Sequence, residues 1–172
     1  TGGIMNPEEL KALQAPIKEQ YKETPEAALI TLRSESNGAE GVACKLETSK
    51  GMIEAGLHPA TGGDGTQACS GDMLLEALTA CAGVTLKAVA TAFGVELTRS
   101  RISAEGDLDF RGTLGVAKDA PVGFRDIRLT FDIDADAPAE TLAKIVQLTE
   151  RYCVVLQTIQ QKPNIEVITA GS

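Results

Sequence analysis

Apolar residues recur along this chain first with the period of a helix and then with the period of a strand. Residues 6–9, Asn-Pro-Glu-Glu, form a capping sequence with a proline in the first turn. Apolar side chains follow at helical spacing as far as Tyr21, and we expect Pro16 to bend or split this helix. The period then falls to two, which predicts three strands, over residues 28–32, 42–47 and 52–57. A glycine-rich segment, residues 58–71, is predicted to be a mobile loop.

Residues 72–93 are apolar at almost every position, which predicts a helix buried on all sides. A helix of this length could also span a bilayer. Glu76 and Lys87 lie inside the stretch and no basic cluster flanks it, so the pattern favours the core helix of a protein with no membrane partner. Helical spacing puts Glu76 and Lys87 on one narrow side and Cys81 elsewhere, so we expect the Cys81 thiol to face the interior.

Strand periodicity returns after this helix and gives way to a second amphipathic helix. The alternating stretches are residues 95–103, 108–111 and 127–134, and a last strand is predicted at 164–169. The second helix begins after Pro138, ends before Pro163 and carries Cys153 on its apolar stripe.

Runs of strands separated by single long helices are typical of the α+β class with antiparallel sheets. The pattern also predicts two parts of the chain. Residues 1–25 form a helical extension, and residues 26–172 form a single domain.

Composition narrows the possible functions. The 172 residues are 43% hydrophobic and 23% charged, which is ordinary for a globular protein. The net charge of −8, without a basic patch, argues against binding to nucleic acid or to an anionic membrane. One histidine and widely spaced cysteines exclude the common metal motifs, so we expect no metal site. Sparse cysteines and no apolar run at the start of the sequence indicate a cytoplasmic protein.

Two thiols on the predicted helices, Cys81 and Cys153, are the candidates for chemistry. A nucleophilic cysteine must be a thiolate, and an unperturbed thiol is almost fully protonated at neutral pH. Cys81 lies beyond the first helical turn, where the helix dipole would help, so its activity requires a cation supplied by the fold. Cys44 fits a strand core, whereas Cys69 is either an incidental exposed thiol or a second partner for Cys81.

The residues around these cysteines resemble a known family. The segment SGDMLLEALTACAGVTL, residues 70–86, resembles the central cysteine helix of the OsmC/Ohr family, and TERYCVVLQTI, residues 149–159, resembles its second cysteine helix. The resemblance extends from about Glu26 onward. It implies an OsmC-like α+β fold in which an intertwined homodimer wraps antiparallel sheets around two long buried cysteine helices.

The same resemblance implies an activity in the oxidative stress response. Active members reduce organic hydroperoxides or hydrogen peroxide with a cysteine pair, without a cofactor, and an external dithiol restores the thiols. Cys81 matches the peroxidatic position and Cys153 the resolving position.

The sequence also departs from the family pattern. Gly71 occupies the place of a glutamate, so that Asp72 and Glu76 are the nearest acids. No arginine lies on the second or third predicted strand, which leaves Arg33 as the candidate cation in this part of the chain. Val154 replaces a proline that often follows the second cysteine. These differences indicate a divergent branch of the family.

Three functional hypotheses follow from these residues. The first is a thiol peroxidase that uses Cys81 and Cys153. The second is a noncatalytic dimer that binds an apolar small molecule between the cysteine helices, since the activating arginine and glutamate are missing. In the third, both cysteines only fill the core.

Overall fold

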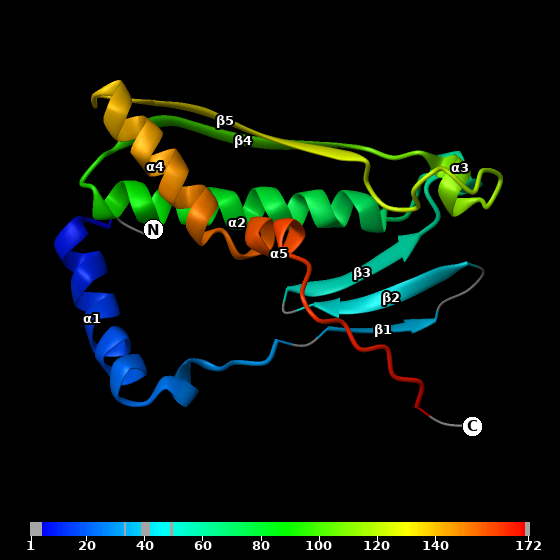
Figure 1. Cartoon of the computed structure of the whole chain (residues 1–172), viewed down its shortest axis with the longest axis horizontal. Coiled ribbons are helices and arrows are strands. Elements are labelled where there is room, and N and C mark those ends of the chain that lie inside the picture. The colour runs from blue at the N-terminus through cyan, green and yellow to red at the C-terminus, as the bar shows by residue number, and fades with distance from the viewer. Residues whose placement is uncertain (1–4, 33, 39–41, 49, 171–172) are drawn as a thin grey trace.

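A long central helix organises the structure, a computed structural model that describes residues 5–32, 34–38, 42–48 and 50–170 (Figure 1). The helices are α1 (Pro7–Glu23), α2 (Ser70–Ala92), α3 (Phe110–Thr113), α4 (Ala139–Tyr152) and α5 (Val154–Gln160). The strands are β1 (Glu35–Gly38), β2 (Ala43–Thr48), β3 (Gly51–Gly56), β4 (Leu97–Asp107) and β5 (Asp126–Ala135). Helices combined with antiparallel sheets confirm the predicted α+β class.

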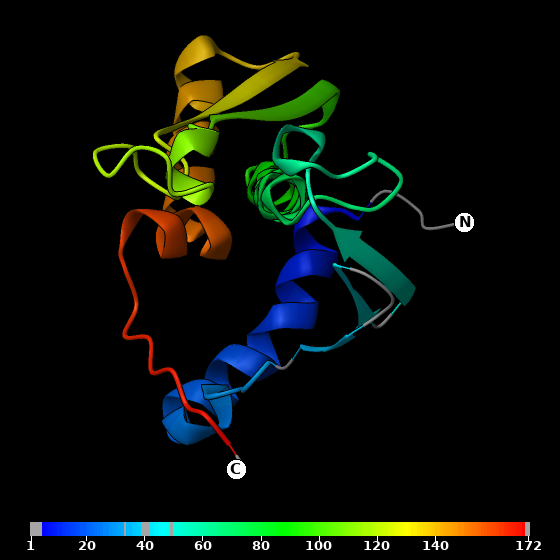
Figure 2. The ribbon, with the colours of Figure 1, turned by 90° about the vertical axis from the view of Figure 1, so that its right-hand side faces the viewer.

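The strands form two small antiparallel sheets. β2 lies between β1 and β3 in one sheet, and β4 pairs with β5 in the other. Figure 2, which looks along α2, shows β4, β5 and α4 grouped on one side of this helix, with the three-stranded sheet on another side. The burial of β5 alternates residue by residue, as the sequence predicts for a strand with one solvent-exposed face.

The core is a single stripe along α2. Near the end of the helix, Leu86 and Ala90 pack against Leu97 of β4 and Ile145 of α4. Nearer its middle, a second cluster contains two buried residues of α2 together with Cys153; these two residues are Leu78 and Ala82. The prediction of a helix buried on all sides is therefore wrong for this single chain. Val84, on the other face of α2, is 73% exposed because no described segment covers it.

Three predicted strands are absent from the described residues. A short 3-10 helix, Pro25–Ala28, ends where the strand predicted at 28–32 would begin, residues 29–32 form no strand, and β1 begins only at Glu35. Proline favours the first turn of such a helix. In place of 108–111, the side chain of Asp109 accepts a hydrogen bond from the Arg111 N–H and caps α3. Residues 164–169 pair with no described strand.

The first helix, α1, has the predicted capping box. The Glu9 N–H donates to Asn6 Oδ1 at 2.8 Å, and the Asn6 N–H donates to Glu9 Oε2 at 2.9 Å. Pro16 does not divide the helix, which runs from Pro7 to Glu23. Its apolar stripe remains exposed in the single chain, with Leu13 at 59%.

By length and hydropathy, α2 is the one helix of the described residues that could cross a membrane. It lies against β4, α4 and α5, and its inward stripe forms both core clusters. This packing is that of a core helix.

Candidate active site at the thiol pair

The packing of α2 against the segment after α4 brings Cys81 and Cys153 together. Cys153 is fully buried, and Cys81 packs against the cluster that contains it. The two side chains lie near enough that each shifts the pKa of the other. The prediction that Cys153 lies on the buried face is confirmed. The Cys81 thiol, by contrast, is partly exposed rather than enclosed.

Cys153 lies at an interruption that the sequence does not predict. α4 ends at Tyr152, Cys153 has extended backbone angles (φ −73°, ψ 104°), and α5 begins at Val154. The Cys153 N–H still donates to the Thr149 carbonyl at 2.9 Å, and the Cys153 carbonyl accepts from the Gln157 N–H at 2.9 Å. The residue thus ends one helix and begins the next, and the first N–H groups of α5 lack partners within that helix.

These N–H groups affect the acidity of both thiols. Those of Val154 and Val155 lower the pKa of Cys81, and those of Val155 and Leu156 oppose the rise in the pKa of Cys153. Backbone donors are well suited to a thiolate because they are fixed in place and need no reorganisation when the charge forms.

The protein environment shifts the pKa values of the two thiols in opposite directions. Burial raises the pKa of Cys81, but hydrogen bonds from Val155, Cys153, Val154 and Thr85 outweigh it and place this pKa below the ordinary thiol value. Burial also raises the pKa of Cys153. There the donation from Leu156 is too weak to compensate, and proximity to Cys81 raises the pKa further. Cys81 is therefore the more acidic thiol of the pair, and Cys153 is the less acidic one.

The charged residues expected to assist Cys81 do not act on it in the described part of the structure. Arg33 lies outside the described residues. Asp72 and Glu76 are exposed on α2 and do not contribute to the Cys81 pKa. A rise of about 1.5 Å per residue separates Asp72 from Cys81 by roughly 13 Å along the axis. Within this part of the chain, hydrogen bonds rather than a cation lower the Cys81 pKa.

Sequence reasoning missed the groups that lower the pKa of Cys81. Thr85 could have been found, because a residue four positions later lies on the same face of a helix. The amides of α5 could not, since residues 154–160 continue the helical pattern of α4 and nothing in that pattern marks a break.

The other two cysteines lie elsewhere. Cys44 is on β2, opposite Ala55 of β3. Cys69 immediately precedes α2, roughly 18 Å along the helix axis from Cys81, so it is not a second partner for that thiol.

The loop that leads to Cys69 is held in place rather than free. Ala68 bridges to Ala55 of β3, and the Asp64 side chain accepts from both the N–H and the hydroxyl of Thr66. A cavity of about 340 Å³ lies beside Cys69, and its wall includes His58, whose ring stacks on that of Phe110.

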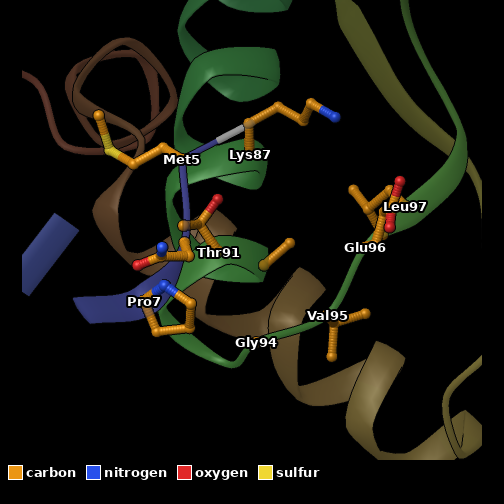
Figure 3. A pocket seen from close by; sticks show the side chains of 10 residues that line it. Met5, Pro7, Lys87, Thr91, Gly94, Val95, Glu96 and Leu97 are labelled. Atoms are coloured by element: carbon orange, nitrogen blue, oxygen red, sulfur yellow. The ribbon is translucent and has the colours of Figure 1, made fainter. Parts of the chain in front are cut away.

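Another cavity, of about 210 Å³, lies where α1 meets the end of α2. Figure 3 shows Met5 and Pro7 on one side of it, Val95 on the other, and Lys87 and Thr91 on the helix between them. It is distinct from the thiol pair. Among the residues that the structure describes, no three His, Cys, Asp or Glu side chains are grouped to hold a metal ion.

Comparison with known proteins identifies the family. The sequence profile of the family described as OsmC-like protein matches residues 63–168, which include both Cys81 and Cys153. The chain belongs to the OsmC-like family. No significant match was found among curated protein sequences.

Solved structures with the same fold include OsmC/Ohr proteins. An OsmC-like protein from Mycoplasma pneumoniae has a TM-score of 0.65 at 16% identity, over 77% of this chain and 89% of the other. An organic hydroperoxide resistance protein from Elizabethkingia anophelis has a TM-score of 0.59 at 12% identity, over 78% and 91%. OhrB of Bacillus subtilis has a TM-score of 0.52 at 21% identity, over 78% and 94%. These likenesses establish the OsmC-like fold of the chain.

Proposed function

We propose that this protein is a thiol peroxidase that reduces organic hydroperoxides or hydrogen peroxide with Cys81 and Cys153. The observation that carries the proposal is that two neighbouring thiols have pKa values shifted in opposite directions. Hydrogen bonds hold the pKa of Cys81 below the ordinary thiol value, and burial holds that of Cys153 above it. A low-pKa, partly exposed cysteine beside a second cysteine is the arrangement found in thiol redox sites.

The reaction would proceed in three balanced steps. The Cys81 thiolate attacks the outer peroxide oxygen and breaks the O–O bond; the alkoxide that leaves takes a proton from water and becomes the alcohol, and Cys81 becomes a sulfenic acid. The Cys153 thiol then condenses with this sulfenic acid, which releases water and forms a disulfide. An external dithiol reduces the disulfide and is itself oxidised.

Exposed apolar surface supports a homodimer as the working form. Val84 on α2, Val154 on α5 and Val167 near the end of the chain are each at least 71% exposed. The hydrophobic effect would favour burial of such side chains in an interface between two copies of the chain. A second copy of this chain would bury the free face of α2, and we place this homodimer in the cytoplasm.

Stopped-flow oxidation by cumene hydroperoxide tests the activity. We expect the reduced wild-type protein to consume the hydroperoxide much faster than free cysteine does, and Cys81→Ser to abolish the reaction. Cys69→Ser is the matched control, because Cys69 is also partly exposed but lies far from the pair. Peptide mapping of the oxidised wild type should show one disulfide, between Cys81 and Cys153.

Three results would contradict the proposal. Consumption of the hydroperoxide no faster than by free cysteine would rule out peroxidase activity. Activity that survives Cys81→Ser would place the chemistry elsewhere. Thiols that resist labelling until the protein is denatured would instead favour the core-filling role.

A further inference from the structure

The break at Cys153 leaves a backbone carbonyl of α4 without its helical donor. In a continuous helix the Glu150 carbonyl would accept from the Val154 N–H, four residues later. The extended backbone of Cys153 interrupts this pattern. The side chain of Gln157, on α5, donates instead, from Nε2 to the Glu150 carbonyl at 2.9 Å. This bond closes a loop of the chain, residues 150–157, that contains Cys153.

Other hydrogen bonds fix the Gln157 amide and the Cys153 backbone within this loop. Gln161 Nε2 donates to Gln157 Oε1 at 3.2 Å, so that the two ends of the Gln157 amide have different partners. The Gln157 N–H donates to the Cys153 carbonyl at 2.9 Å, and the Cys153 N–H donates to the Thr149 carbonyl at 2.9 Å. Gln157 thus binds Cys153 through its backbone and the end of α4 through its side chain.

Within the described chain, α5 is held mainly from one side. It packs against α2 and α4, and Val155 and Leu156 lie against the cluster of Cys153, which Cys81 also contacts. The residues that follow, 161–170, are all exposed and pair with no described strand. A side-chain hydrogen bond across the break is therefore well placed to set the direction of α5 relative to α4.

We infer that Gln157 is a positioning residue: its side-chain amide holds the break in one shape and so keeps Cys153 beside Cys81. Cys153 is fully buried in a packed cluster, so its sulfur can change position only if the backbone around it moves. A displacement of about 1 Å is enough to slow a positioned reaction strongly. The consequence for peroxide reduction rests on the proposed function, but the effect on disulfide formation does not.

Three substitutions isolate the side-chain donor. Gln157→Met removes the donor with little change in side-chain length, and methionine suits a partly exposed helical position. Gln157→Lys is the rescue variant, because its amino group restores a donor on a side chain long enough to reach the same carbonyl. Gln160→Met is the matched control, since it makes the same replacement at an exposed position of the same helix, outside the loop.

The measurement is the equilibrium between the thiol pair and glutathione in the full-length protein. Oxidised glutathione takes two electrons from the pair and becomes two reduced molecules, and peptide mapping gives the fraction of Cys81–Cys153 disulfide. For Gln157→Met we expect the equilibrium constant for disulfide formation to fall by about three- to tenfold, the range of one net hydrogen bond. Gln160→Met should match the wild type, and Gln157→Lys should recover most of the loss. A change in global stability alone would not shift this equilibrium, because both forms are folded.

Equal constants for Gln157→Met and the wild type would overturn the inference, and so would the same fall in Gln160→Met. A wild type that forms no disulfide between Cys81 and Cys153 would overturn it as well. If circular dichroism shows that Gln157→Met does not fold, Gln157→Ala removes the donor with the residue that most favours a helix. That variant must show the same fall, and a wild-type constant for it would equally overturn the inference.

Hydroperoxide kinetics on the same proteins distinguish the two proposals. A wild type that fails to reduce cumene hydroperoxide, while Gln157→Met lowers the disulfide constant as expected, would rule out peroxidase activity and leave the positioning role in place. Active protein with an unaltered disulfide constant in Gln157→Met would rule out only the positioning role.

Discussion

Truncation of Leu78 to alanine tests the packing that holds the thiol pair together. Leu78 is fully buried, and it packs with Ala82 and Cys153 in the cluster on which Cys81 rests. The substitution removes three carbon groups worth about 0.8 kcal/mol each, or roughly 2.4 kcal/mol of transfer free energy. The cavity left behind adds to this, so we expect the free energy of unfolding to fall by about 3–4 kcal/mol.

Leu86→Ala provides the comparison. Leu86 is equally buried on the same helix but belongs to the cluster with Ala90, Leu97 and Ile145, away from the cysteines. Urea unfolding at one fixed protein concentration, under reducing conditions, should show a similar loss of stability for both variants. Their effects on the thiols should differ, because the Leu78 cavity opens beside Cys153 and the Leu86 cavity does not.

Oxidation by diamide, followed by peptide mapping, measures that difference. A displacement of about 1 Å can slow a positioned reaction by up to about a hundredfold. We therefore expect the disulfide between Cys81 and Cys153 to form at least severalfold more slowly in Leu78→Ala than in Leu86→Ala. The reasoning is refuted if Leu78→Ala loses less than about 1 kcal/mol, or if both variants slow disulfide formation equally.

The structure also makes three other predictions. Because the pKa of Cys81 is lowered and that of Cys153 is raised, alkylation should label Cys81 at the lower pH, and equal midpoints would contradict this order. By the same shift, the Cys81 contribution to stability should be present above the ordinary thiol pKa and be lost as the pH falls through the lowered value, which unfolding measured across alkaline pH would show. Gly106→Ala should lower the free energy of unfolding in urea by about 1–3 kcal/mol, because its new methyl group would clash with the Phe124 ring. Gly123→Ala meets nothing within 4 Å and should be nearly neutral in the same urea unfolding experiment, so equal losses would argue against the position of that ring.

Sequence periodicity predicted the helices and strands whose type follows from their own residues alone. The unbroken apolar run of α2 and the strict alternation of β5 each define one type of element, and the capping box sets the start of α1. The burial of Cys153 could be predicted from the same patterns, and so could the family, whose motifs lie around the two cysteines. The strand predictions were wrong where residues that favour turns or helix starts lie beside a weak alternation of apolar residues, as at Pro25 and Asp109.

The activating environment of Cys81 could not be predicted in this way. Residues 154–160 have the pattern of a continued helix, and only the packed chain shows that the backbone changes direction at Cys153. An amide donor leaves no mark in a sequence, since every residue except proline carries one and its direction depends on the backbone around it. The amino-acid sequence therefore determined which thiols are present and which helices carry them. Tertiary structure alone decided which thiol is the more acidic, because that depends on where N–H groups from a distant segment point.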